Sequence, residues 1–206
     1  MYEYETMLLQ QGNAHIAGTD EAGRGPLAGP LVVAAVILDP ALRIEGLNDS
    51  KKLSHKKRVA LAEEIKSKAF DYALVEFDST TVDRLNVYQA SKRGMTQAVG
   101  QLKSVDHVLS DAMPFEHPCG VTALIKGDQK SATIAAASIL AKVRRDEMMV
   151  DYAQMYPHYG FESHKGYGTK KHIEALRSYG ACAIHRRSFA PVRQALKRQI
   201  KLNVGE

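Results

Sequence analysis

Apolar and polar residues follow two periods along the chain, and together these periods predict an α/β protein. Two apolar stretches near the N-terminus, His15–Asp20 and Leu31–Leu38, predict strands joined through a glycine-rich segment, which favours a hairpin. Shorter apolar runs predict three more strands, at about 72–77, 106–111 and 121–125. The sequence therefore predicts a sheet whose later strands are separated by longer, helical segments.

Apolar residues at helical spacing predict where those helices lie. The residues after Lys52 predict a charged amphipathic helix that runs to about Lys68, and helical sequence follows at about 80–102. A long helix is predicted from Ser131, its N-cap, and Pro157 closes it. A loop over 158–168 and two helices, at about 169–179 and 190–202, complete the chain. Without repeats or a clear linker, residues 1–206 are predicted to form a single domain.

Composition narrows the class of protein. At 206 residues, with 45% hydrophobic and 25% charged residues, the chain can build a well-buried core. The longest apolar run, Leu31–Leu38, is too short to span a bilayer, and the acidic N-terminus does not look like a signal peptide. The two cysteines, Cys119 and Cys182, stand too far apart for a disulfide framework or zinc-type spacing. We expect a cytoplasmic monomer without membrane contact.

The net charge of +5 is unevenly distributed. Residues 142–206 hold 13 basic and 6 acidic side chains, whereas residues 1–141 hold 15 basic and 17 acidic ones. A basic segment of this kind suits a polyanion, because lysine and arginine displace counterions from phosphates. Ordinary solvated helix faces would explain the same charges. Charge alone therefore leaves nucleic-acid binding by residues 142–206 open.

The stretch GTDEAGRGPLAGP, which begins at residue 18, concentrates the candidate chemistry. Asp20 and Glu21 stand immediately before a turn made of Gly23, Arg24 and Gly25. Carboxylates can hold a divalent metal ion, while a glycine–arginine–glycine turn offers backbone N–H groups and a guanidinium to an anion. This stretch predicts a site where metal ions and a phosphate backbone meet.

Two more carboxylates occupy comparable places at strand ends. Asp111 ends the run HVLSD, and Asp128 follows the run VTALIKGD. Strand ends are where separate segments of an open sheet converge on one site. Oxygen ligands without histidine or cysteine suit Mg²⁺ or Mn²⁺, and two such ions about 3.5–4 Å apart support phosphodiester hydrolysis. Each acid taken singly is also typical of a surface turn, so only their joint placement favours a metal site.

Strand geometry raises a difficulty for the first two acids. Successive side chains on a strand point to opposite faces, so Asp20 and Glu21 cannot both reach one site from a regular strand. Either the strand ends at Asp20, which the glycines that follow would allow, or Glu21 contributes through its backbone carbonyl.

Five separated motifs in this order resemble the bacterial ribonuclease HII family. These five motifs, which follow the stretch at residue 18, are LNDSKKLS (47–54), the SDA around Asp111, KGDQKSATIAAASILAKVRRD (126–146), YPHYGFESHKGYGT (156–169) and HRRSFAPVR (185–193). The resemblance covers about residues 15–193. It implies a ribonuclease H-like fold, with a mixed central sheet flanked by helices and a helical C-terminal segment. One departure lies at Tyr179–Ile184, where YGACAI replaces an expected proline-containing turn.

The resemblance also assigns roles to residues. It implies that the metal-binding catalytic acids are Asp20, Glu21, Asp111 and Asp128. It implies that backbone contacts from Gly23, Arg24 and Gly25 read the substrate's 2′-hydroxyl, the group that distinguishes RNA from DNA. Two further residues complete the implied site: Tyr167, which packs on the nucleotide at the RNA–DNA junction, and Lys51, which lies near the phosphates. Other basic side chains, among them Arg186, could contact nucleic acid or serve only as surface charges.

The implied activity is two-metal hydrolysis, with Mn²⁺ or Mg²⁺, of the phosphodiester on the 5′ side of a ribonucleotide. The substrates would be RNA–DNA hybrids and DNA duplexes with single embedded ribonucleotides. Three alternatives remain: a ribonuclease HIII-type enzyme, a non-catalytic nucleic-acid-binding module on the same fold, and a glycosidase that uses two of the carboxylates. The fourth acid, Asp128, disfavours the first, because ribonuclease HIII carries a glutamate there.

Overall fold

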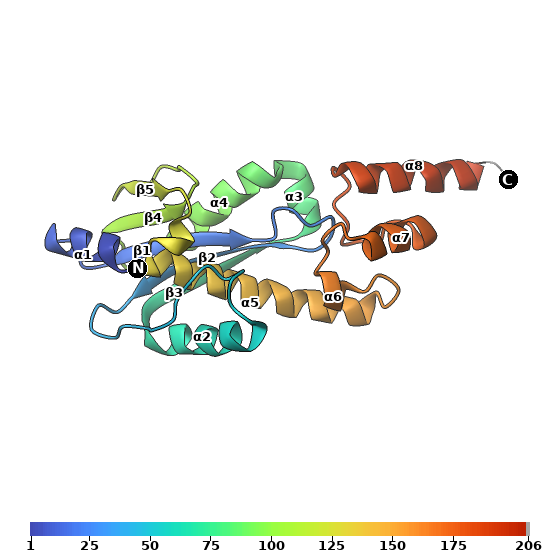
Figure 1. Cartoon of the computed structure of the whole chain (residues 1–206). Coiled ribbons are helices and arrows are strands. Elements are labelled where there is room, and N and C mark those ends of the chain that lie inside the picture. Colours follow the sequence, from blue (N-terminus) through green and yellow to red (C-terminus); the bar gives the residue numbers. More distant parts are fainter. Residues whose placement is uncertain (205–206) are drawn as a thin grey trace. The chain divides into compact units, whose positions relative to one another are not determined.

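A computed structural model describes residues 1–204 of the chain, with the backbone alone for 199–204. The chain divides into two compact units. The sheet unit comprises Met1–Ala22, Val32–Glu76 and Ser91–Arg144, and the C-terminal unit comprises Gly23–Leu31, Phe77–Ala90 and Arg145–Glu206. Figure 1 labels the elements of both. The single-domain prediction stays a prediction.

Five strands form one mixed sheet in the order β3-β2-β1-β4-β5. β1 pairs antiparallel with β2, as the hairpin prediction requires, and β4 pairs parallel with both β1 and β5. All eight residues of β2, LVVAAVIL, are buried, which is typical of a strand covered on both faces. The bounds are β1 (Ile16–Ala22), β2 (Leu31–Leu38), β3 (Ala69–Phe77), β4 (His107–Asp111) and β5 (Val121–Leu124). The predicted α/β class and mixed sheet are thereby confirmed.

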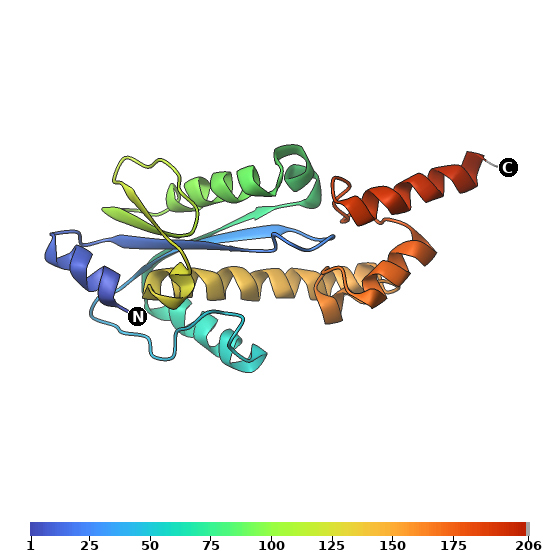
Figure 2. The ribbon, with the colours of Figure 1, turned by 45° about the horizontal axis from the view of Figure 1, so that its top comes forward.

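Helices cover both faces of this sheet, with α4 (Val87–Val99) on one face and α5 (Ala132–Met155) on the other (Figure 2). α5 approaches β1 so closely that a Cβ atom at Gly18 would lie 2.2 Å from the Thr133 backbone carbon. Ser131 caps α5, because its Oγ accepts the Ile134 N–H at 3.2 Å, as predicted. The remaining helices of the unit are α1 (Glu3–Gln10) and α2 (His55–Lys68).

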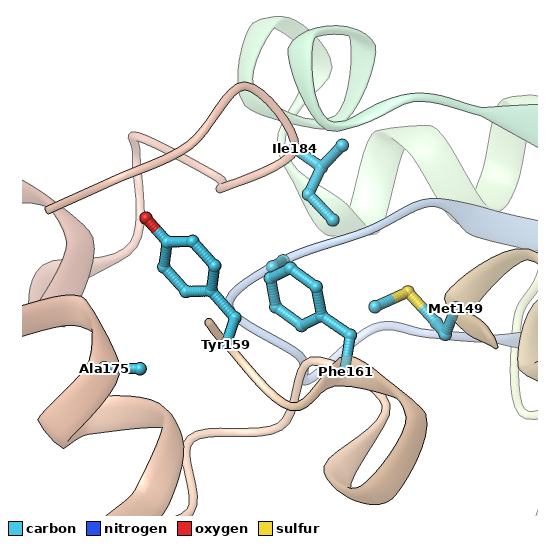
Figure 3. Packing of buried hydrophobic residues seen from close by; sticks show 6 residues of the cluster. Met149, Tyr159, Phe161, Ala175 and Ile184 are labelled. Carbon is cyan, nitrogen blue, oxygen red and sulfur yellow. The ribbon is translucent and has the colours of Figure 1, made fainter. Parts of the chain in front are cut away.

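The C-terminal unit is built from helices and loops around its own apolar core. Tyr159 and Phe161 stack at 5.2 Å between ring centroids, and Met149, Ala175 and Ile184 pack with them (Figure 3). A second cluster joins Leu27, Leu176, Val192 and Ala195. The elements are α3 (Ser79–Leu85), α6 (Phe161–His164), α7 (Lys170–Tyr179) and α8 (Ala190–Val204), with the last part of α5. Among the described residues, no helix is both long and apolar enough to cross a membrane.

The helical sequence predicted at about 80–102 is confirmed, and it forms two helices, because Asn86 has a positive φ of 61° and its Oδ1 caps α4 by accepting the Gln89 N–H at 3.0 Å. One local prediction was wrong. The segment 158–168, predicted as a loop, contains the single helical turn α6. A four-residue helix has too little periodic sequence to be recognised from its pattern.

Candidate active site

Three predicted acids lie at one edge of the sheet. The parallel β1–β4 register places Thr19 opposite Ser110, so Asp20 and Asp111 follow at matching positions on neighbouring strands. Strands are about 4.8 Å apart in a sheet, which brings the two carboxylates close together. Beyond β5 the chain returns through Gly127, whose N–H donates to Asp111 Oδ1 at 2.6 Å. Asp128, next in sequence, is thereby held at the same edge.

Burial and the neighbouring negative charges raise the pKa values of two of these carboxylates. Asp20 and Asp128 are each 6% exposed. Burial raises the pKa of Asp20 well above its ordinary value, and the charges of Glu21 and Asp111 raise it further. The Glu21 N–H, 2.6 Å from Asp20 Oδ1, and the Ser138 hydroxyl offset part of this increase.

The pKa of Asp128 is also raised, to about 6, first by burial and then by the charges of Asp49 and Asp111. Lys51 acts in the opposite direction and lowers it. Asp49 is therefore a further carboxylate at this edge, one that the sequence reasoning did not single out. Carboxylates that repel one another in this way are stabilised in their ionised form by a bound cation.

The donor set fits a hard divalent ion by its chemistry. No three histidine, cysteine or acidic side chains enclose a metal position as they stand in the described part of the chain. The groups at this edge are nevertheless carboxylates, which Mg²⁺ and Mn²⁺ prefer as ligands, and burial together with neighbouring negative charges raises the pKa values of Asp20 and Asp128. These oxygen ligands therefore suit Mg²⁺ or Mn²⁺ better than Zn²⁺.

Glu21 is placed differently from the expectation that the first strand ends at Asp20. β1 continues to Ala22, and Glu21 pairs with Val33 of β2. The side chains of Asp20 and Glu21 therefore leave the strand on opposite faces. Of the two options given by the sequence, a contribution through the Glu21 backbone carbonyl is the one compatible with this strand. The role of Glu21 as a ligand stays a prediction.

The loop that carries Lys51 is tied to the same acids. Asp49 Oδ1 accepts the Lys51 N–H at 2.9 Å. Ser138 Oγ hydrogen-bonds Ser50 Oγ at 2.8 Å, and the Ser138 hydroxyl also interacts with Asp20. The loop is thus held against both Asp20 and Asp128, while the Lys51 side chain is exposed. This arrangement suits the predicted place of Lys51 near a phosphate, although it does not test that role.

The predicted turn belongs to the C-terminal unit, and its first glycine is required by sterics. Gly23 has φ 102°, and a Cβ atom there would lie 2.3 Å from Arg145 Nε and 2.6 Å from the Pro30 carbonyl oxygen. Gly25 has more room, since its nearest neighbour would be Tyr167 Cε1 at 3.6 Å. The two glycines therefore serve different purposes: the first allows the backbone to fold, and the second keeps a contact surface open.

The guanidinium of Arg186 determines which way the turn's peptide groups face. Its Nη2 donates to the Gly23 carbonyl at 2.6 Å and its Nη1 to the Arg24 carbonyl at 3.0 Å. It also donates to the carbonyls of Gly29 and Pro30. In a trans peptide the N–H points opposite to the carbonyl, so the amides of Arg24 and Gly25 point away from Arg186. Two consecutive N–H groups facing one way form an anion- or hydroxyl-binding concavity.

Arg186 itself is a correction to the sequence reasoning, which considered it either a nucleic-acid contact or a surface charge. Its exposed fraction is 0%, so it is neither. Burial and the neighbouring Arg145 guanidinium lower its pKa. No sequence periodicity marks a buried arginine in a loop, and only its carbonyl partners reveal its place.

Tyr167 lies beside the turn, as its predicted role requires. Its ring edge approaches Gly25, and the Arg145 guanidinium lies 6.0 Å from the ring centroid. Arg145 also donates to the carbonyls of Ala28, Pro30 and Lys165, which ties the turn to the Tyr167 loop. The Tyr167 side chain remains 43% exposed, enough to present a ring to a ligand.

The predicted residues thus form two groups. The sheet unit contains Asp20, Glu21, Asp111, Asp128 and Lys51, and the C-terminal unit contains Gly23, Arg24, Gly25 and Tyr167. Along the chain the groups are joined at the peptide bond between Ala22 and Gly23. Among the residues that support them, sequence reasoning missed Asp49, Ser138 and Arg145, and it gave Arg186 the wrong role.

Comparison with known proteins relates this arrangement to one family. The family model described as Ribonuclease HII matches residues 17–192. The chain is 49% identical over 201 residues to a ribonuclease HII of Bacillus cytotoxicus, covering 97% of this chain and 78% of that protein. A ribonuclease HII of Listeria monocytogenes is 51% identical over 196 residues, covering 95% of this chain and 75% of that protein.

Solved structures agree with these matches. The ribonuclease H2 of Pyrococcus horikoshii superimposes with a TM-score of 0.78 at 27% identity, covering 91% of this chain and 99% of that one. A Bst ribonuclease HIII in complex with Mn²⁺ gives a TM-score of 0.69 at 19% identity, covering 91% and 70%, and shows likeness of fold alone. The ribonuclease H-like fold predicted from the motifs is therefore confirmed.

Proposed function

The chain belongs to the ribonuclease HII family and is a ribonuclease H of type 2, and we propose that it cleaves on the 5′ side of ribonucleotides. Its substrates are RNA–DNA hybrids and DNA duplexes that contain single ribonucleotides. The family excludes the non-catalytic module, the glycosidase and the ribonuclease HIII-type enzyme considered from the sequence. Removal of misincorporated ribonucleotides from DNA is the task that such an activity serves.

One observation carries the proposal. The acids and the turn stand next to each other in sequence, and the buried Arg186 directs the amides of Arg24 and Gly25 away from itself. An N–H group only donates hydrogen bonds, so this pair can bind an acceptor such as a 2′-hydroxyl oxygen or a phosphate. Such contacts read the sugar and not the base, which supports sequence-independent recognition of a ribonucleotide.

The catalytic part of the proposal assigns the metal ligands to the sheet edge. Two divalent ions, Mn²⁺ or Mg²⁺, would be held by Asp20, Glu21, Asp111 and Asp128. When bound, such ions supply Lewis acidity that activates water and stabilises the leaving oxygen. The raised pKa values of Asp20 and Asp128 support this assignment, because they mark carboxylates that a cation would stabilise.

The remaining residues bind and orient the substrate. Tyr167 offers its exposed ring to the nucleotide at the RNA–DNA junction, and stacking on an aromatic ring contributes about 1–3 kcal/mol per base. Lys51 offers a cation to a phosphate from the loop beside Asp49. The products keep a 5′-phosphate on the ribonucleotide and a 3′-hydroxyl on the upstream nucleotide, because water attacks the phosphorus and the upstream 3′-oxygen leaves.

A direct test uses a DNA duplex with one ribonucleotide and Mn²⁺ or Mg²⁺. The wild-type protein should cut it once, and Asp111→Asn should abolish cleavage while binding of the duplex persists. Cleavage of an all-DNA duplex in preference to the ribonucleotide duplex would overturn the proposal. So would undiminished cleavage by Asp111→Asn.

A further inference from the structure

A group of buried histidines in the C-terminal unit is not used by the proposed chemistry. His172 and His185 are 0% and 2% exposed. Their rings pack around Phe161, with centroids at 5.4 and 5.8 Å from its ring (Figure 3 shows Phe161 within this core). His164 stacks on His172 at 4.5 Å. Apolar packing alone would not require imidazoles at these positions, whereas their hydrogen bonds do.

Those bonds run in one direction. A backbone N–H can only donate, so His185 Nδ1 accepts from the Cys182 N–H at 3.0 Å and carries no proton. A neutral His185 then has its proton on Nε2, which faces His172 Nε2 at 3.0 Å. At the other end a carbonyl can only accept, so His172 Nδ1 donates to the Tyr167 carbonyl at 2.9 Å.

Each histidine of the pair must therefore be neutral, and each must adopt a different tautomer. His185 holds its proton on Nε2 and His172 holds its proton on Nδ1, so a single N–H lies between the two Nε2 atoms. A second proton there would place two donors face to face. Burial agrees with this state, since it lowers the pKa of His172 and lowers that of His185 to about 4.

This chain of hydrogen bonds begins at Cys182, in the segment that carries Arg186, and ends at Tyr167, the proposed nucleotide contact. The Ile184 carbonyl accepts the Gly29 N–H at 2.9 Å, the Arg186 N–H donates to the Leu27 carbonyl at 2.8 Å, and the Arg186 side chain holds the turn. The segment 182–186 thus contacts the turn directly, and it contacts Tyr167 through the histidines. Its first residue, Cys182, lies in the stretch where the sequence departs from the family pattern.

We propose that His185 and His172 are positioning residues that hold Tyr167 in register with the glycine–arginine–glycine turn. Through them, one segment sets both parts of the ribonucleotide reader: Arg186 orients the turn's amides, and the histidine pair orients the backbone of Tyr167. This inference rests on the proposed function, because it is there that Tyr167 and the turn are assigned to the substrate.

Two substitutions of His172 separate its roles. In His172→Asn the side-chain amide nitrogen takes the place of Nδ1 and can still donate to the Tyr167 carbonyl. In His172→Gln the amide extends toward His185 and the donor to Tyr167 is lost. We expect His172→Asn to lose about threefold in kcat/KM on a single-ribonucleotide duplex, because it keeps the donor to Tyr167 but gives up the bond to His185, and His172→Gln to lose about tenfold. The loss should lie in KM, since the metal-binding acids are untouched.

A double variant tests whether His172 acts through Tyr167. If it does, Tyr167→Ala combined with His172→Gln should be no worse than Tyr167→Ala alone. Additive losses, or equal losses for His172→Asn and His172→Gln, would overturn the inference. The exposed His158, which stacks on Tyr179 in the same unit, offers a matched control: His158→Gln should leave the kinetics unchanged.

The wild-type protein gives a test that does not depend on variant folding. Two-bond ¹H–¹⁵N spectra at neutral pH report which ring nitrogen of each histidine carries the proton. We expect one buried histidine with its proton on Nδ1 and its partner with the proton on Nε2. Two identical tautomers, or a protonated ring, would contradict the inference. If the tautomers are as expected but no ribonucleotide duplex is cut, the proposed function fails and the bond chain stands.

Discussion

Replacement of Arg186 by lysine should damage recognition of the ribonucleotide more than it damages the metal site. The guanidinium makes five hydrogen bonds to four carbonyls, those of Gly23, Arg24, Gly29 and Pro30. An ammonium has three donors without a fixed fork, so at least one carbonyl would lose its partner. A buried carbonyl left unsatisfied costs about 1–3 kcal/mol. That energy is sufficient to reorient one peptide of the turn.

The effect should be visible in steady-state kinetics. A loss of about 1–3 kcal/mol in transition-state binding lowers kcat/KM by roughly 5- to 150-fold on a duplex with one ribonucleotide. Mn²⁺ binding, followed by calorimetry, should stay unchanged because the proposed metal ligands belong to the sheet unit. Arg187→Lys is the matched control, since the Arg187 side chain is exposed and its backbone N–H bonds Asp83. We expect its kinetics to stay within about twofold of wild type.

Two results would refute this reasoning. Wild-type kcat/KM in Arg186→Lys would mean that the turn keeps its orientation without the guanidinium fork. Equal loss of Mn²⁺ binding and of cleavage would mean that Arg186 supports the whole fold and not the turn. Thermal melting of each variant shows whether assays at 25 °C sample folded protein.

Three further predictions follow from single contacts. Gly23→Ala should unfold the protein or lower its stability by about 3 kcal/mol or more, because the Cβ would overlap Arg145 and Pro30 at positive φ. Gly25→Ala should melt like wild type but cleave poorly, because its methyl group would lie 3.6 Å from Tyr167, the proposed nucleotide contact. In EDTA at pH 7.5, Asp128→Asn should raise the free energy of unfolding by about 1–2 kcal/mol after solvent screening, and with Mn²⁺ or Mg²⁺ added it should abolish cleavage. Because the folded pKa of Asp128 is raised to about 6, the stability gain should fade as the pH drops below 6, and a gain independent of pH would contradict this reasoning. The folded pKa of His185 is lowered to about 4, so His185 binds a proton preferentially in the unfolded chain. The free energy of unfolding in urea, taken as wild type minus His185→Gln, should therefore fall by up to about 3 kcal/mol as the pH drops from 6.5 to 4. A difference that stays constant would show that His185 is not held neutral.

The proposed catalytic acids were the part of the candidate site most accessible to sequence reasoning. Asp111 stands at the last position of a short apolar run, and Asp128 follows the next run, so strand ends alone indicate their convergence. The parallel register of β1 and β4 then brings Asp20 beside Asp111 without any further signal. The apolar period and the strand order therefore predict that these acids converge, because residues that follow neighbouring parallel strands meet at the same end of the sheet.

The supporting residues could not be predicted in the same way. Arg145 and Arg186 are charged residues with exposed fractions of 1% and 0%, and a pattern-based prediction places arginine at the surface. Their burial depends on backbone carbonyls that become available only once the turn has folded. The histidine pair is equally hidden, because its tautomers follow from bonds between residues 13 positions apart. Irregular backbone, and not side-chain period, determines these contacts.

Glu21 shows the opposite limitation. The glycines after it suggested that the strand ends at Asp20, yet β1 continues through its pairing with Val33. Cross-strand hydrogen bonds to β2 outweigh the local preference of glycine for a turn, and the turn begins only at Gly23 with its positive φ. A local propensity was overruled by tertiary pairing.

The central claim is that the turn selects the site by its contact with a 2′-hydroxyl and that the carboxylates cut beside it. The most direct measurement uses three duplexes that differ at one nucleotide, with 2′-hydroxyl, 2′-hydrogen or 2′-O-methyl, and identifies the product ends by mass spectrometry. The account predicts cleavage of the 2′-hydroxyl duplex alone, on the 5′ side of the ribonucleotide, with a 3′-hydroxyl and a 5′-phosphate. Cleavage of the 2′-hydrogen duplex, or a 2′,3′-cyclic phosphate product, would contradict it.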